Sequence, residues 1–156
     1  MLQDLNQVLF IVGPTASGKS GLAIQIANHL QTQNIPTLII SADSRQIYLD
    51  LDIITAKEQA RPKPFPENLK LSPYKIQGVD HYMLDILKPT ESFTLFDFKE
   101  LAEKIIQEHI GKAKIIIAGG TGLYVDCLIN NYQIPKSQTI DPTIRKQIEQ
   151  NYQSLL

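Results

Sequence analysis

Short apolar runs, most of them bounded by glycine or proline, recur along this chain. Such runs predict β-strands that are covered on both faces, because a strand with one face in water alternates apolar and polar residues. Four segments have this character, at residues 8–12, 37–41, 83–87 and 114–118. The first three are followed by turn-forming or polar residues and the last by two glycines, so each predicted strand leads into a loop.

Between these runs, apolar residues recur with the spacing of one helix face. Helices are predicted after Lys19, after Thr94, over 122–129 and from Pro142 onward. Thr94 and Asp97 have the form of a capping box, in which hydroxyl and carboxylate satisfy the backbone at a helix start. The alternation of strands and helices predicts an α/β protein, a three-layer fold with a parallel central sheet.

The composition is that of one folded domain. The chain has 156 residues, 43% of them hydrophobic, and its 15 basic side chains nearly balance 16 acidic ones. Without net positive charge it is not a protein that coats nucleic acid nonspecifically, although a local RNA site is compatible with this balance. Cys127 is the only cysteine, and no leader peptide or membrane-spanning stretch is evident. We therefore expect a monomeric cytoplasmic protein with no membrane partner.

Residues 13–20 read GPTASGKS and fit the phosphate-loop pattern G-x-x-x-x-G-K-[ST]. A predicted strand before the loop and a predicted helix after it supply the context that this motif requires. Lys19 adds a full charge to the backbone N–H groups that face a phosphate, and the Ser20 hydroxyl can hold Mg²⁺. The predicted diphosphate- or nucleotide-binding residues, in a P-loop NTPase-like fold, are Gly13, Pro14, Thr15, Ala16, Ser17, Gly18, Lys19 and Ser20.

A carboxylate is expected beside this loop. Asp43 follows the predicted strand 37–41, and the carboxyl ends of parallel strands share one edge of a sheet. Asp43 can hold Mg²⁺ through water, act as a general base, or only cap the turn after the strand. Thr121, in the glycine-rich turn 119–122, can donate a hydrogen bond into the site or only cap its helix. The residues alone leave these alternatives open.

Residues 58–75 form the least regular part of the chain. They hold four of its nine prolines and show little periodicity, which indicates an insertion in the core. Lys57 can reach the phosphate edge, although a lone lysine is more often solvated. The basic residues in and beside this segment offer an RNA-backbone contact or, as we favour, belong to a solvated loop. They are Lys57, Arg61, Lys63, Lys70 and Lys75.

Together these segments resemble the tRNA dimethylallyltransferase family. The resemblance implies transfer of a dimethylallyl group from dimethylallyl diphosphate to N6 of the adenosine beside the anticodon of tRNA. The matching segments are GPTASGKS at 13–20, SADSRQIY at 41–48, LDIITAK at 51–57, HYMLDI at 81–86, Asp97-Phe98, GGTGLYV at 119–125 and the turn from Asp141 to Arg145.

The resemblance also implies roles for single residues. Asp43 would be the general base at the adenine amine, with Lys19 and Thr121 as further catalytic residues, and Ser20 would hold Mg²⁺ with the diphosphate. Gln46 suits an adenine edge because its amide both donates and accepts. Contacts to the anticodon loop of tRNA would come from Asp43, Ser44, Arg45, Gln46, Thr121 and Arg145.

This chain departs from the family in three respects. Family members are considerably longer, so we expect residues 1–135 to be the catalytic core and 136–156 the truncated start of a tRNA-binding helical insertion. Ile54 replaces a usual glycine, and Asp80-His81-Tyr82 replaces a usual Pro-His-His, so we interpret His81 as structural.

Two other functions remain compatible with the residues. One is a P-loop kinase for a small molecule or nucleotide, although the chain has only three arginines and no segment that resembles a lid. The other is a non-catalytic remnant that binds a diphosphate or tRNA.

Overall fold

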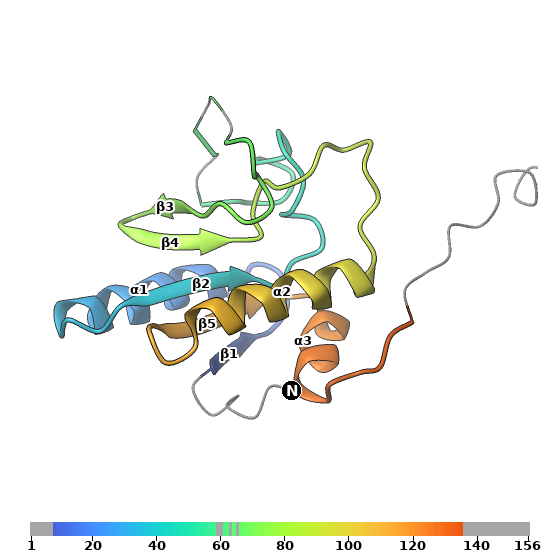
Figure 1. Cartoon of the computed structure of the whole chain (residues 1–156). Coiled ribbons are helices and arrows are strands. Elements are labelled where there is room, and N and C mark those ends of the chain that lie inside the picture. Colours follow the sequence, from blue (N-terminus) through green and yellow to red (C-terminus); the bar gives the residue numbers. More distant parts are fainter. Residues whose placement is uncertain (1–7, 59–60, 63, 65, 136–156) are drawn as a thin grey trace, which may run out of the picture.

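A computed structural model of the chain describes residues 8–58, 61–62, 64 and 66–135. It has three layers, with helix α1 (Lys19–Thr32) on one face of a central sheet and helices α2 (Leu95–His109) and α3 (Gly122–Ile129) on the other (Figure 1). In sheet order the five strands are β1 (Val8–Val12), β5 (Lys114–Gly119), β2 (Thr37–Ser41), β4 (Val79–Tyr82) and β3 (Tyr74–Ile76). The predicted fold class is confirmed.

The sheet is parallel except at one edge. Strands β1, β5, β2 and β4 run parallel, whereas β3 pairs antiparallel with β4 through a turn at Gln77 and Gly78, both of which have positive φ. Such two-residue turns suit the twist of a hairpin. This hairpin begins inside the segment that we predicted to be irregular, so the irregular stretch is shorter than expected. At the opposite edge, β1 pairs only with β5 among the described residues, and Leu9 and Val12 are about half exposed.

The predicted strand over 83–87 is wrong. Strand β4 ends at Tyr82, and Met83 and Asp85 have φ values of 62° and 52°, which no strand contains. Only Leu87 returns to a strand-like pairing, as an isolated bridge to Tyr48. The run is nonetheless buried throughout, so its apolar character reports burial in the core and not an extended backbone.

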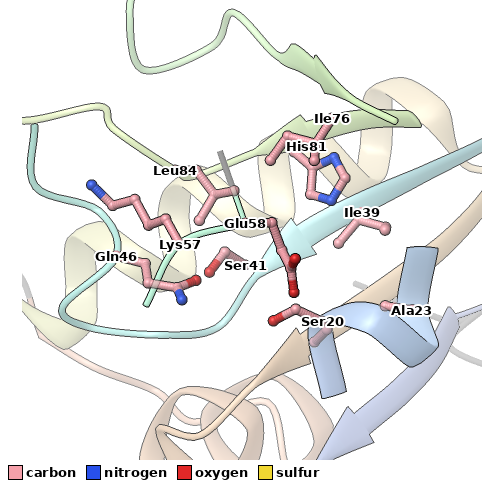
Figure 2. Close-up of a pocket in the computed structure, with 11 residues that line it drawn as sticks. Ser20, Ala23, Ile39, Ser41, Gln46, Lys57, Glu58, Ile76, His81 and Leu84 are labelled. Atoms are coloured by element: carbon pink, nitrogen blue, oxygen red, sulfur yellow. The ribbon is translucent and has the colours of Figure 1, made fainter. Parts of the chain in front are cut away.

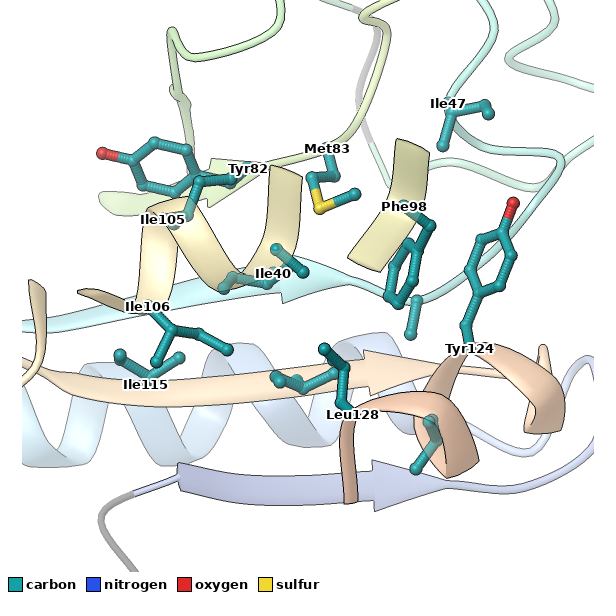
Figure 3. Packing of buried hydrophobic residues seen from close by; sticks show 14 of the residues in the cluster. Ile40, Ile47, Tyr82, Met83, Phe98, Ile105, Ile106, Ile115, Tyr124 and Leu128 are labelled. Carbon is teal, nitrogen blue, oxygen red and sulfur yellow. The ribbon is translucent and has the colours of Figure 1, made fainter. Parts of the chain in front are cut away.

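Successive residues of the central strands pack on opposite faces of the sheet. Ile39 and Ile116 belong to the cluster under α1, whereas their neighbours Ile40 and Ile117 belong to the cluster under α2 and α3. Figure 3 shows side chains of the second cluster, among them Phe98 and Ile40, filling the space between sheet and helices. Because both faces are covered, these strands carry continuous apolar runs and present a rigid edge to the loops that follow them.

The predicted capping box starts α2. The Thr94 hydroxyl accepts from the Asp97 backbone N–H at 3.2 Å, and Asp97 Oδ2 accepts from the Thr94 N–H at 2.8 Å. We expect Thr94→Ala to lower the free energy of unfolding by about 1 kcal/mol in urea titrations, because the Asp97 backbone N–H loses the hydroxyl that caps it. Thr90→Ala, at an exposed position in the preceding loop, is the matched control. Equal stability of the two variants would contradict the prediction.

Candidate active site

Three loops meet at the carboxyl edge of the sheet, after β1, β2 and β5. Together with Thr55, Ala56 and Glu58 they line an open pocket of about 300 Å³, at the lower end of the range for small-ligand sites. The sequence-predicted residues that line this pocket are Thr15, Ala16, Gly18, Lys19, Ser20, Asp43 and Gln46. The structure therefore brings together the phosphate loop, the candidate carboxylate and the candidate base-reading amide.

The phosphate loop has the backbone that an anion site needs. Gly18 has a φ of 82° and precedes helix α1, whose first turn has no side-chain cap, so its N–H groups remain available to an anion. The Lys19 ammonium lies over its own loop and donates to the carbonyl of Pro14. Gly120 touches this loop from the β5 side, since a Cβ there would lie 3.4 Å from the Gly13 carbonyl oxygen.

Asp43 caps a turn, which is one of its predicted alternatives, and it also lines the pocket. Its Oδ1 accepts from the backbone N–H of Arg45 at 2.9 Å, so the side chain does cap the turn after β2. Its Oδ2 has no hydrogen-bond partner among the described residues, and Asp43 lines the pocket. One oxygen thus fixes the carboxylate, and the other is not engaged by the described residues and can take a proton or help to hold a metal.

The pocket suits Mg²⁺ better than a transition metal. The oxygen groups in its lining that could hold a metal include the Ser20 hydroxyl and the carboxylates of Asp43 and Glu58. The described part of the chain contains no group of three or more His, Cys, Asp or Glu side chains that could hold a metal by themselves. Mg²⁺ prefers oxygen and commonly takes one or two protein ligands together with phosphates, so these residues fit it.

Thr121 ties two loops together. Its hydroxyl accepts from the Ser44 backbone N–H at 3.0 Å and donates to Ser44 Oγ at 3.2 Å, while its own N–H donates to Ala42. Thr121 occupies the N-cap position of α3, as one alternative predicted, but its side chain makes no capping hydrogen bond there. The hydroxyl proton is used between the loops, and Thr121 therefore places the segment that carries Asp43.

The prediction of a solvated Lys57 is also wrong. Its side chain is 0% exposed, and its ammonium donates to the Tyr48 carbonyl at 2.6 Å, to Asp52 Oδ1 at 3.1 Å and to Asp85 Oδ1. These partners lie up to 28 residues away in sequence. The basic composition of residues 58–75 therefore does not predict that Lys57 is buried.

Arg61 is likewise buried and not part of a solvated loop. It is 6% exposed, donates to the carbonyls of Ser72 and Leu84 at 2.7 and 3.3 Å, and lies 4.5 Å over the Tyr74 ring. Desolvation lowers the pKa of this guanidinium. Lys75 pairs with Asp80 across the hairpin, Lys70 is exposed, and Lys63 and Arg145 lie outside the described residues. Because Lys57 and Arg61 are buried, fewer charges remain for the alternative of an RNA-backbone contact.

A smaller cavity of about 30 Å³ lies behind the pocket and shares Ser20, Gln46, Glu58 and Ala118 with it. Figure 2 shows His81 and Ile39 at its inner end. His81 is 5% exposed, and its Nδ1 lies 2.9 Å from the Val79 carbonyl oxygen. The cavity is large enough for one water molecule.

His81 should make stability depend on pH. Burial lowers its pKa, so below the ordinary histidine pKa of about 6.5 the unfolded chain binds a proton that the folded protein does not. Stability is then full above this pH and is lost as the pH falls toward the folded-state pKa. Between about pH 7.5 and 5.5 the wild-type melting temperature should fall by roughly 2–4 °C more than that of His81→Asn, whose amide can still donate to Val79. Parallel curves of melting temperature against pH would contradict this.

The described residues include no helix that is both long and apolar enough to cross a membrane. The IPP transferase family profile matches residues 46–155. The chain is 45% identical over 94% of its length to a tRNA dimethylallyltransferase of Acetivibrio thermocellus and 39% identical over 97% to one of Staphylococcus haemolyticus.

Among solved structures, the chain is similar to the tRNA isopentenylpyrophosphate transferase of Bacillus halodurans. The TM-score is 0.66 at 34% identity, over 94% of this chain and 43% of that one. The chain spans about two fifths of the length of the curated relatives, 40% and 41% of the two transferases above.

Proposed function

Because this chain belongs to the IPP transferase family, we propose that it transfers a dimethylallyl group from dimethylallyl diphosphate to N6 of the adenosine beside the anticodon of tRNA. The observation that carries the proposal is that Lys19, Asp43 and Gln46 line one pocket. An ammonium suited to a diphosphate, a carboxylate, and an amide suited to a nucleobase therefore line the same space. A tRNA substrate also places the reaction in the cytoplasm.

The adenine amine is a weak nucleophile, since its lone pair is delocalised into the ring. As the N6–carbon bond forms, the carbon–oxygen bond to the diphosphate breaks, and its electron pair leaves with the diphosphate. The N6 proton goes to Asp43 Oδ2, the oxygen that is not engaged by the turn. The Arg45 N–H keeps this carboxylate in place during the transfer.

The leaving diphosphate carries the charge that the site must stabilise. Lys19 and the N–H groups at the start of α1 are positioned to receive it. Mg²⁺ bound by Ser20 would neutralise part of the same charge, and Asp43 and Glu58 are the carboxylates that line the same pocket.

The base must leave the anticodon stack to reach this pocket. Gln46 is the side chain that would contact the base. Ser44, Arg45 and Thr121 lie in or against the same loop and would contact the surrounding RNA. Arg45 is exposed and can meet a phosphate. The predicted RNA contact at Arg145 lies outside the described residues.

The test is incubation of the full chain with labelled dimethylallyl diphosphate, Mg²⁺ and unmodified tRNA, followed by nuclease digestion and mass spectrometry for prenylated adenosine. Asp43→Asn should lower the rate by roughly 10²- to 10⁴-fold and leave the affinity for inorganic diphosphate within about twofold. Asp126→Asn, at an exposed position on α3, is the matched control.

Two results would contradict the proposal. ATP turnover on a small acceptor without prenylated RNA would indicate a kinase. Diphosphate and tRNA binding without any product would indicate a binding protein. A loss of diphosphate affinity in Asp43→Asn that depends on Mg²⁺ would assign Asp43 to the metal and not to the proton.

A further inference from the structure

The Gln46 side chain is oriented by one backbone carbonyl. Its Nε2 donates to the Thr55 carbonyl oxygen at 3.0 Å. Because that oxygen can only accept, the amide nitrogen must face it, and the Gln46 Oε1 is left without a hydrogen-bond partner among the described residues. Gln46 lines both the pocket and the small cavity, so its free oxygen is available to a ligand (Figure 2).

The Thr55 carbonyl is fixed by the buried lysine two residues later. The Lys57 ammonium has three N–H bonds, and they are taken by the Tyr48 carbonyl, Asp52 and Asp85. Lys57 lines the small cavity, but in Figure 2 its ammonium end points away from Ser41 and Ile39. Lys57 therefore does not offer its charge to a ligand, and its contacts hold the segment that carries Thr55.

Asp85 anchors Gln46 from the other side. Its Oδ1 accepts from Lys57 and its Oδ2 accepts from the Tyr74 hydroxyl at 3.1 Å, while its backbone N–H donates to the Gln46 carbonyl at 3.1 Å. Asp85 is 1% exposed. Burial and this carboxylate raise the pKa of Tyr74, which stays a neutral donor. Asp85 thus holds the Gln46 backbone directly, and its ion pair with Lys57 holds the segment whose Thr55 carbonyl orients the Gln46 amide.

On the basis of the proposed function, we infer that Lys57 and Asp85 are positioning residues that make the site prefer a 6-aminopurine to a 6-oxopurine. The Gln46 Oε1 accepts a hydrogen bond from an exocyclic amine. A 6-oxo group would instead place its own acceptor oxygen against the Gln46 Oε1, and no hydrogen bond could form. Direct base contacts of this kind discriminate by roughly 5- to 150-fold, and an amide free to rotate would lose this preference.

The test uses two RNA stem-loops that differ only in the target base, adenine or hypoxanthine. Fluorescence anisotropy with the full chain should show at least about tenfold tighter binding of the adenine RNA. Lys57→Met should reduce this preference to below about threefold and leave the affinity for inorganic diphosphate unchanged, because Lys57 does not line the phosphate pocket. Lys75→Met removes an exposed lysine that forms an ion pair with Asp80, and should keep the wild-type preference.

The outcomes separate this inference from the proposed function. Full preference in folded Lys57→Met would overturn the inference alone, whereas a wild type without any preference would also contradict the proposed function. Where Lys57→Met does not fold, Asp85→Asn decides, because it removes the charge that pairs with Lys57 and keeps the size of the side chain and the backbone N–H that donates to Gln46. A preference reduced at least about threefold in Asp85→Asn supports the inference, and an unchanged one overturns it.

Discussion

Gly119→Ala is expected to lower the melting temperature by roughly 10 °C. A Cβ at this position would lie 2.2 Å from the Ala42 carbonyl oxygen and 2.3 Å from its carbon, which are backbone atoms of the neighbouring strand end. These atoms cannot swing aside as a side chain would, because Ala42 is bound on both sides, to Ala118 and to Thr121. Separating β2 from β5 should cost about 3 kcal/mol or more, and thermal unfolding followed by circular dichroism measures it.

Gly122→Ala is the matched control for this substitution. Nothing lies within 4 Å of the Cβ that it would add, and Gly122 is the first residue of α3. Since alanine favours helix more than glycine does, this variant should melt at or slightly above the wild-type temperature. If Gly119→Ala proved as stable as Gly122→Ala, the close approach of the two loops described above would be wrong.

Lys19→Met is expected to weaken the binding of inorganic diphosphate by about 30- to 150-fold. The substitution keeps the length and apolar stem of the side chain but removes the only ammonium group that lines the pocket among the described residues. A hydrogen bond to a charged group contributes about 1.5–3 kcal/mol, and the larger part of that range applies where both partners are ionised. Isothermal titration calorimetry in the presence of Mg²⁺ measures the change.

The control for Lys19→Met is Lys112→Met. Lys112 is exposed in the connection that leads into β5, at the opposite edge of the sheet from the pocket. This variant loses the same charge but should keep wild-type affinity, which separates a local contact from the effect of net charge. Undiminished binding in Lys19→Met would show that the diphosphate is bound elsewhere.

The elements that sequence alone predicts well are those whose signals are local. Strands 8–12 and 37–41 and helix 122–129 begin and end at the predicted residues. Each has an apolar run or stripe of the right length with turn residues next to it, and the capping box of α2 is complete within four residues. The phosphate loop is equally local, because its function depends on the backbone of one short segment.

The features that the sequence does not reveal depend on distant partners. Lys57 is buried because Asp85, 28 residues later, neutralises it, and Thr121 joins Ser44 across 77 residues. Nothing near either residue distinguishes a buried ion pair from a solvated lysine, or a link between loops from a helix cap. The run 83–87 shows the same limit, because apolar character reports burial while the positive φ values come from the tertiary structure.

The position of β1 has a consequence for the colloidal behaviour of this chain. Its five residues are all apolar, carry no charge and contain no proline, and one side of the strand has no pairing partner among the described residues. An unpaired edge of this composition is a template for further extended chains, and therefore a starting point for intermolecular β-aggregation. Among the described elements, the strand that leads into the phosphate loop is therefore also the one whose shielding sets the protein concentration at which aggregation begins.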